Sequence, residues 1–165
     1  MKVAVVNSCI PFVAGESENL AEALRQQLNE YGHPAIIVSI PSRWHRPSAI
    51  VENILACRCL RLPQIDLMIG LNIPACYLPH PNKVLWLVDL RHIQDLPATE
   101  EAAKVRETVI AADNRYLREA RKIYAISETV SRRVRSFNAI ASEVLYPPLL
   151  PNRLHWDHVI RKLIL

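Results

Sequence analysis

Glycine is scarce in this chain, and that scarcity narrows the kinds of protein it can be. Three of the 165 residues are glycine and twelve are proline, which indicates rigid turns and argues against flexible linkers. No Gly-x-Gly-x-x-Gly fingerprint follows the first apolar stretch, so a dinucleotide-binding protein is disfavoured. The sequence also lacks any run of about 18 apolar residues, and we therefore expect no segment to span a membrane.

Cysteine is limited as well, and its pattern favours a reducing compartment. The chain has four cysteines and no evident export signal, because charged residues follow soon after Ser17. We therefore expect free thiols in a cytoplasmic protein. Cys57 and Cys59 lie two residues apart on a predicted helix and point in different directions, so buried small residues are favoured over a metal site. No metal or other cofactor is expected.

The charge balance is mildly basic. The formal net charge is +4, which permits contact with acidic groups without requiring it. Basic residues concentrate in the second half of the chain, at Arg118, Arg121, Lys122, Arg132, Arg133 and Arg135. Such residues usually form solvated helix faces; the alternative is peripheral contact with anionic lipid headgroups at the inner face of a membrane. No nucleic-acid-binding motif accompanies them, so nucleic acid is not an expected partner.

The first thirty-two residues carry the clearest structural pattern. Val3–Val6 is a short apolar run, typical of a buried parallel strand. After a loop, three leucines spaced four residues apart mark an amphipathic helix that ends at Gly32. Ligands of open parallel sheets bind beyond the carboxyl ends of the strands, so the loop Cys9–Ser17 is expected to face a ligand site.

Strand and helix patterns alternate through the rest of the chain and predict the fold class. The further predicted strands are Ala35–Ser39, Asp66–Gly70, Lys83–Val88, Lys122–Ile126 and Ser142–Tyr146. Helical patterns lie at 48–60, 99–120 and 127–138, with a break expected near Asp113 and with Ser48 and Ser127 as N-caps. We therefore expect an α/β, Rossmann-like three-layer domain with a mainly parallel sheet of about six strands.

A set of short segments, taken in order, carries a family resemblance. They are Pro11-Phe12-Val13 with Gly15, Asp66–Leu71, His80–Leu87, Ala112–Arg115, Leu117–Arg121, Ile126-Ser127 with Val130, Arg133 and Phe137-Asn138, and Val144–Pro148. In this combination the chain resembles the N-terminal half of bacterial retaining glycosyltransferases of the two-domain GT-B fold, in the group 1, family 4-like class. The resemblance implies that residues 1–150 form a Rossmann-like acceptor-side domain. Residues 151–165, with apolar positions at helical spacing, would then be a tail or the start of an interdomain hinge.

The resemblance also implies a function. In that family a sugar moves from a nucleotide-sugar to a glycan or lipid acceptor, and the C-terminal domain holds most of the donor. These 165 residues do not include such a domain, so we expect weak binding of both ligands and no transfer by this chain alone. The alternatives are a non-catalytic binding module, one subunit of a split glycosyltransferase paired with a donor-binding subunit, or an unrelated small Rossmann-like protein.

The chain departs from the family pattern at three places. Gly15 is followed by Glu16 where the family usually has paired glycines, and a carboxylate at a helix N-terminus repels phosphate. After the fourth predicted strand the chain reads Val88–His92, in a register that places no catalytic histidine, so the catalytic residues stay unassigned. Ala139 stands in place of glycine in an Asn-Gly-Ile turn, and we expect that turn to be rebuilt.

Six residues are the candidate ligand contacts: Gly15, Glu16, Asp89, Arg91, His92 and Ser127. The first two open the first helix, and the next three follow the fourth strand, so both groups are expected at the ligand edge of the sheet. A tight turn and an ordinary polar loop are the competing interpretations. Asp89 could act as a general base, whereas Ser127 is more simply explained as a helix cap.

Overall fold

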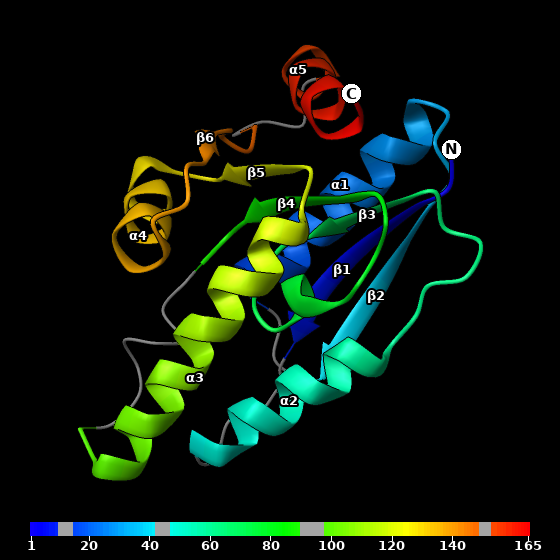
Figure 1. The fold of residues 1–165 in the computed structure, drawn as a ribbon. Coiled ribbons are helices and arrows are strands. Elements are labelled where there is room, and N and C mark those ends of the chain that lie inside the picture. The colour runs from blue at the N-terminus through cyan, green and yellow to red at the C-terminus, as the bar shows by residue number, and fades with distance from the viewer. Residues whose placement is uncertain (10–14, 42–46, 90–97, 149–152) are drawn as a thin grey trace.

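The chain folds around one parallel β-sheet. The computed structural model describes residues 1–9, 15–41, 47–89, 98–148 and 153–165 (Figure 1). Within these residues the strands are β1 (Val3–Cys9), β2 (Ala35–Pro41), β3 (Leu67–Gly70), β4 (Lys83–Leu87), β5 (Lys122–Ala125) and β6 (Glu143–Val144). They form a six-stranded sheet of order β2-β1-β3-β4-β5-β6, in which every neighbouring pair is parallel. The predicted α/β class is confirmed.

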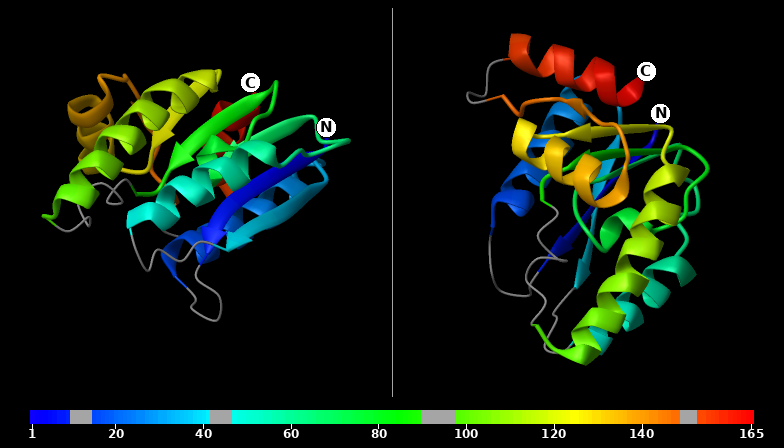
Figure 2. Two further views of the ribbon diagram at one scale, coloured as in Figure 1. Left: turned by 60° about the horizontal axis from the view of Figure 1, so that its bottom comes forward. Right: turned by 60° about the vertical axis from the view of Figure 1, so that its left-hand side comes forward.

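Helices cover both faces of this sheet and complete a three-layer, Rossmann-like domain (Figure 2). They are α1 (Glu16–Glu30), α2 (Pro47–Cys59), α3 (Glu100–Tyr116), α4 (Glu128–Asn138) and α5 (Arg153–Ile164), with 3-10 turns at Ala75–Tyr77 and Leu117–Glu119. Helices α1 and α5 pack on one face, and α2, α3 and α4 on the other. Among the described helices, none is long and apolar enough to cross a membrane.

The central strands are apolar on both sides because each side meets a separate core. In β1, Ala4 and Val6 belong to the core beneath α2 and α3, whereas Val3 and Val5 belong to the core beneath α1 and α5. All four side chains are fully buried. A strand buried on both faces reads as a continuous apolar run with no polar alternation, which is why the sequence pattern located it.

Two expected helix features are wrong. Helix α2 begins at Pro47, so Ser48 lies inside the helix and is not its N-cap; proline suits a first helical position because its missing N–H would be unpaired there anyway. Helix α3 runs without a break through Asp113 to Tyr116. The helix tolerates Asp113 because this fully buried carboxylate accepts a hydrogen bond from the Tyr77 hydroxyl at 2.6 Å, a tertiary contact that outweighs its weak helix propensity.

Helix α5 is docked on the sheet through tryptophan. Trp156 is buried and meets Trp86 of β4 edge to face, with ring centroids 6.3 Å apart. The indole N–H of Trp86 donates to the carbonyl of Leu145 at 2.8 Å, and the hydroxyl of Tyr124 donates to the carbonyl of Lys162 at 2.9 Å. The C-terminal residues therefore contribute to the core over α1.

The turn after α4 keeps a left-handed residue, so the expectation that it would be rebuilt is wrong. Ala139 has φ 50° and ψ 37°, and its N–H donates to the carbonyl of Arg135 at 3.0 Å. The neighbouring side chains of Asn138 and Ile140 are both buried, which holds the chain on this path. In this left-handed conformation the Cβ of alanine crowds the backbone, so Ala139 is sterically strained.

Replacing Ala139 with glycine is therefore expected to raise the free energy of unfolding by about 1 kcal/mol, because glycine adopts a positive φ without strain. Urea denaturation followed by circular dichroism measures this change. Ala141→Gly is the matched control, since Ala141 is also exposed but has no positive φ; it should destabilise by about 0.5 kcal/mol. Equal effects of the two substitutions would contradict the strain at Ala139.

Candidate functional site

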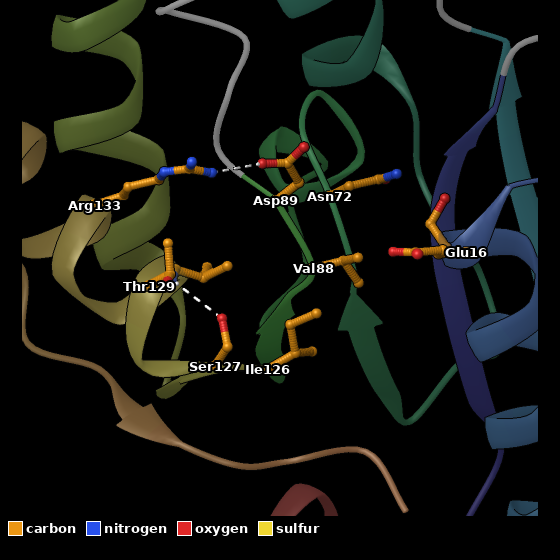
Figure 3. A pocket seen from close by; sticks show the side chains of 10 residues that line it. Glu16, Asn72, Val88, Asp89, Ile126, Ser127, Thr129 and Arg133 are labelled. Atoms are coloured by element: carbon orange, nitrogen blue, oxygen red, sulfur yellow. Dashed lines mark hydrogen bonds and ion pairs between the residues drawn. The ribbon is translucent and has the colours of Figure 1, made fainter. Parts of the chain in front are cut away.

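A cleft of about 540 Å³ opens at the carboxyl edge of the sheet. It is lined by Glu16, Ser17, Asn72, Val88, Asp89, Ile126, Ser127, Thr129, Val130 and Arg133 (Figure 3). These residues come from the first turn of α1, the first two turns of α4 and the segments that follow β3, β4 and β5. Open parallel sheets bind their ligands at this edge.

The floor of the cleft is apolar and held by the sheet. Val88 and Ile126 continue β4 and β5 by one residue each, and both are half-buried. The N–H of Val88 donates to the carbonyl of Leu71 at 2.8 Å, and the N–H of Ile126 donates to that of Leu87 at 3.0 Å. These bonds extend the parallel ladder into the cleft, so the floor has a fixed shape.

The start of α1 forms one wall. Gly15 is the N-cap residue, and its N–H donates to Oε2 of Glu18 at 3.0 Å. The hydroxyl of Ser17 donates to the same oxygen at 3.0 Å. A Cβ on residue 15 would lie 2.9 Å from that oxygen, so glycine at this position leaves room for the carboxylate that caps the helix. Glu16, the next residue, lines the cleft.

The start of α4 forms the opposite wall. Ser127 caps this helix, since its hydroxyl accepts a hydrogen bond from the N–H of Val130 at 3.3 Å, and the expectation of a cap there is confirmed. Arg133, further along α4, extends toward Asp89, which follows β4 (Figure 3). Its Nη1 lies 3.3 Å from Oδ1 of Asp89, and both side chains are about a third exposed, at 29% and 33%. The cleft thus contains a half-buried ion pair.

The structure brings together three of the six candidate residues. Glu16, Asp89 and Ser127 line the same cleft, and Gly15 lies directly beside it without being part of the lining. Arg91 and His92 fall outside the described residues.

Sequence reasoning missed three polar residues of this cleft as ligand-site candidates, namely Asn72, Thr129 and Arg133. Arg133 was grouped with the basic helix residues, although its spacing of three from Val130 marks the same face of α4. Asn72 lies two residues after the end of β3, as Asp89 lies two residues after the end of β4. Its amide accepts from the Ser8 N–H at 2.6 Å and donates to the Ser8 carbonyl at 3.0 Å, and so holds the end of β1 beside the cleft.

The charges and surfaces of the lining suit hydroxyl groups. The carboxylates of Glu16 and Asp89 can accept hydrogen bonds from hydroxyls, and the guanidinium of Arg133 can donate to hydroxyl or ring oxygens. Val88 and Ile126 offer an apolar surface for C–H groups. Across the part of the chain that the structure describes, no cluster of three or more histidine, cysteine, aspartate or glutamate side chains could hold a metal ion.

Comparison with known proteins does not assign this chain to a group. No family model matches the chain, and no curated protein matches it. A functional proposal therefore rests on the fold, on the cleft and on the resemblance carried by the short sequence segments.

Proposed function

We propose that this chain is the acceptor-side domain of a glycosyltransferase that moves a sugar from a nucleotide-sugar to a glycan or lipid acceptor. The observation that carries the proposal is the cleft at the carboxyl edge of the sheet, in which the carboxylates of Glu16 and Asp89 stand beside an apolar surface. Sugars present both a ring of hydroxyls and an apolar C–H face, and such a cleft offers partners for each.

In the proposed reaction an acceptor hydroxyl forms a bond to the anomeric carbon of the donor. The bond from that carbon to the diphosphate oxygen breaks, and the hydroxyl proton leaves to a base or to the departing phosphate. The role proposed for this cleft is to hold and orient the hydroxyl that attacks, which removes entropy from the reaction. Asp89 and Glu16 would accept hydrogen bonds from neighbouring hydroxyls, and Arg133 would donate to their oxygens.

The diphosphate of the donor needs cationic or N–H partners that this cleft offers poorly. Its lining carries two carboxylates and one arginine, and that arginine already pairs with Asp89. We therefore propose that a donor-binding domain or subunit holds the nucleotide-sugar, and that the described domain alone performs no transfer.

A non-catalytic sugar-binding module is the second candidate. This candidate is favoured because several polar groups at the cleft already form hydrogen bonds or ion pairs within the protein. The Ser127 hydroxyl caps α4, the Asn72 amide holds Ser8, and Arg133 pairs with Asp89. A binding module needs such a preformed surface and needs no activated nucleophile.

Titrations of the isotope-labelled protein test the proposal. With methyl α-D-glucopyranoside as a neutral probe, NMR amide shifts are expected first in the lining residues 16–17, 88–89, 127, 129 and 130. UDP-glucose, the donor probe, should shift the same amides more weakly, because the cleft offers its diphosphate few cationic partners. A parallel assay should detect no release of glucose from UDP-glucose.

Asp157→Asn on α5 is the matched control, since Asp157 pairs with Arg161 away from the cleft; it should leave the titration unchanged, whereas Asp89→Asn should weaken binding of the neutral probe about fivefold. Shifts confined to residues 29–33 or 63–65, at the other end of the sheet, would refute the placement of the site.

A further inference from the structure

Asp89 and Arg133, which both line the cleft, form an ion pair. Among the described lining residues Arg133 is the one cation, and Glu16 and Asp89 are the anions. Nη1 of Arg133 lies 3.3 Å from Oδ1 of Asp89. Asp89 comes from the end of β4 and Arg133 from α4, so the pair joins the floor of the cleft to one wall (Figure 3). The carboxylate of Asp89 therefore offsets the positive charge of Arg133 inside the cleft.

Without this neutralisation, the same side of the cleft would suit phosphate. The first turn of α4, with Ser127, Thr129 and Val130, lines the cleft together with Arg133. A helix N-terminus presents N–H groups and a positive dipole end, and an arginine beside it supplies strong charge-assisted hydrogen bonds. The pairing of Arg133 with a carboxylate withdraws the strongest of these partners from an incoming anion. The carboxylate of Asp89 would also repel the anion directly.

We propose that Asp89 is a specificity-determining residue, which makes the cleft select uncharged, hydroxyl-bearing ligands and reject phosphate-bearing ones. The selection of uncharged ligands rests on the proposed function. The rejection of phosphate is argued separately, from the ion pair and the lining residues. A neutral sugar can add hydrogen bonds to both partners while their charges stay paired. A phosphate would have to replace Asp89 at Arg133 and approach that carboxylate unpaired, which costs binding energy.

Binding of inorganic phosphate, measured by NMR titration and calorimetry, tests the proposal in a set of variants. Asp89→Asn preserves shape and an acceptor oxygen but removes the charge, and it should tighten phosphate binding about tenfold. Adding Arg133→Gln to that variant should return the affinity to the level of the unchanged protein. Glu128→Gln is the matched control, because Glu128 is an exposed residue in the first turn of α4 outside the lining and carries the same charge; it should change the affinity less than threefold.

Arg133→Gln alone gives a second measurement that does not depend on the Asp89 variant folding. Because Asp89 already offsets the charge of Arg133, this substitution should lower the weak phosphate affinity less than about threefold, through the carboxylate that it leaves unpaired. A loss of about tenfold or more would mean that Arg133 binds phosphate in the unchanged protein, and the proposal would fall. It would also fall if folded Asp89→Asn bound phosphate no more tightly than the unchanged chain.

The neutral probe separates this proposal from the proposed function. If methyl α-D-glucopyranoside leaves the cleft amides unshifted, the sugar-binding function and the selection of uncharged ligands fail together. Exclusion of phosphate by Asp89 is still decided by the phosphate titrations. If the sugar binds but Asp89→Asn does not gain phosphate affinity, the sugar-binding function survives and the role of Asp89 is refuted.

Discussion

Replacing Trp86 with alanine is expected to lower the free energy of unfolding by about 4 kcal/mol. Trp86 is fully buried in β4, and it connects elements far apart in the sequence. Its indole N–H donates to the carbonyl of Leu145, and its ring meets Trp156 edge to face. Alanine would leave a large cavity between the sheet and α5, an unpaired carbonyl and a lost aromatic contact. Urea denaturation followed by far-UV circular dichroism measures the loss.

Trp86→Phe is the matched variant, because it keeps an aromatic ring in the core and removes the N–H donor. It should cost about 2 kcal/mol, part for the smaller ring and part for the unpaired carbonyl of Leu145. Both substitutions should alter the near-UV circular dichroism of Trp156, since that ring loses its contact with the indole of Trp86. A cost below about 1 kcal/mol for Trp86→Ala would mean that α5 does not pack on the sheet as described.

Replacing Lys83 with methionine is expected to cost about 3 kcal/mol, although methionine fills a similar volume. Lys83 is fully buried at the start of β4. Its ammonium donates to the carbonyls of Cys76 at 3.2 Å and Tyr116 at 3.0 Å, and to the carboxylate of Glu119 at 3.1 Å. Methionine has no donor, so buried carbonyls lose their partner while Glu119 keeps only its pairing with Arg58 at 2.8 Å.

The cost of this substitution should depend on pH. Burial lowers the pKa of Lys83 below its usual value of 10.5, against the opposing effect of Glu119. Between the lowered pKa and 10.5 the unfolded chain therefore binds this proton more tightly than the folded chain, and the stability contributed by this group is lost as the pH falls through that window. The deficit of Lys83→Met relative to the unchanged protein should thus grow as the pH approaches 10.5.

Lys162→Met provides the control for Lys83. Lys162 is partly exposed and pairs with Glu143 at 2.6 Å, and removal of such a surface pair should cost less than about 1 kcal/mol. If Lys83→Met and Lys162→Met cost the same amount, the buried donor network of Lys83 would be refuted.

Local sequence patterns correctly predicted the elements that depend on short-range features of the chain. The apolar run Val3–Val6 predicted β1 because a central parallel strand is buried on both faces. Ser127 predicted the start of α4 because a capping hydroxyl acts on an N–H only three residues away. The predictions at Ser48 and Asp113 were wrong for different reasons. Helix α2 begins one residue before Ser48, at Pro47. Asp113 is stabilised inside α3 by the hydroxyl of Tyr77, a distant residue that a local helix propensity does not include.

The sequence by itself determined the order of strands and helices, and with it the edge of the sheet at which Glu16 and Asp89 lie, since parallel strands share their carboxyl ends. Only the tertiary structure decided the charge of the cleft. Arg133 and Asp89 are 44 residues apart, and their pairing depends on the packing of α4 beside β4 and β5. Whether an arginine side chain is available to a ligand or is paired with a neighbouring carboxylate depends on distances of a few ångströms. No local sequence pattern determines such distances.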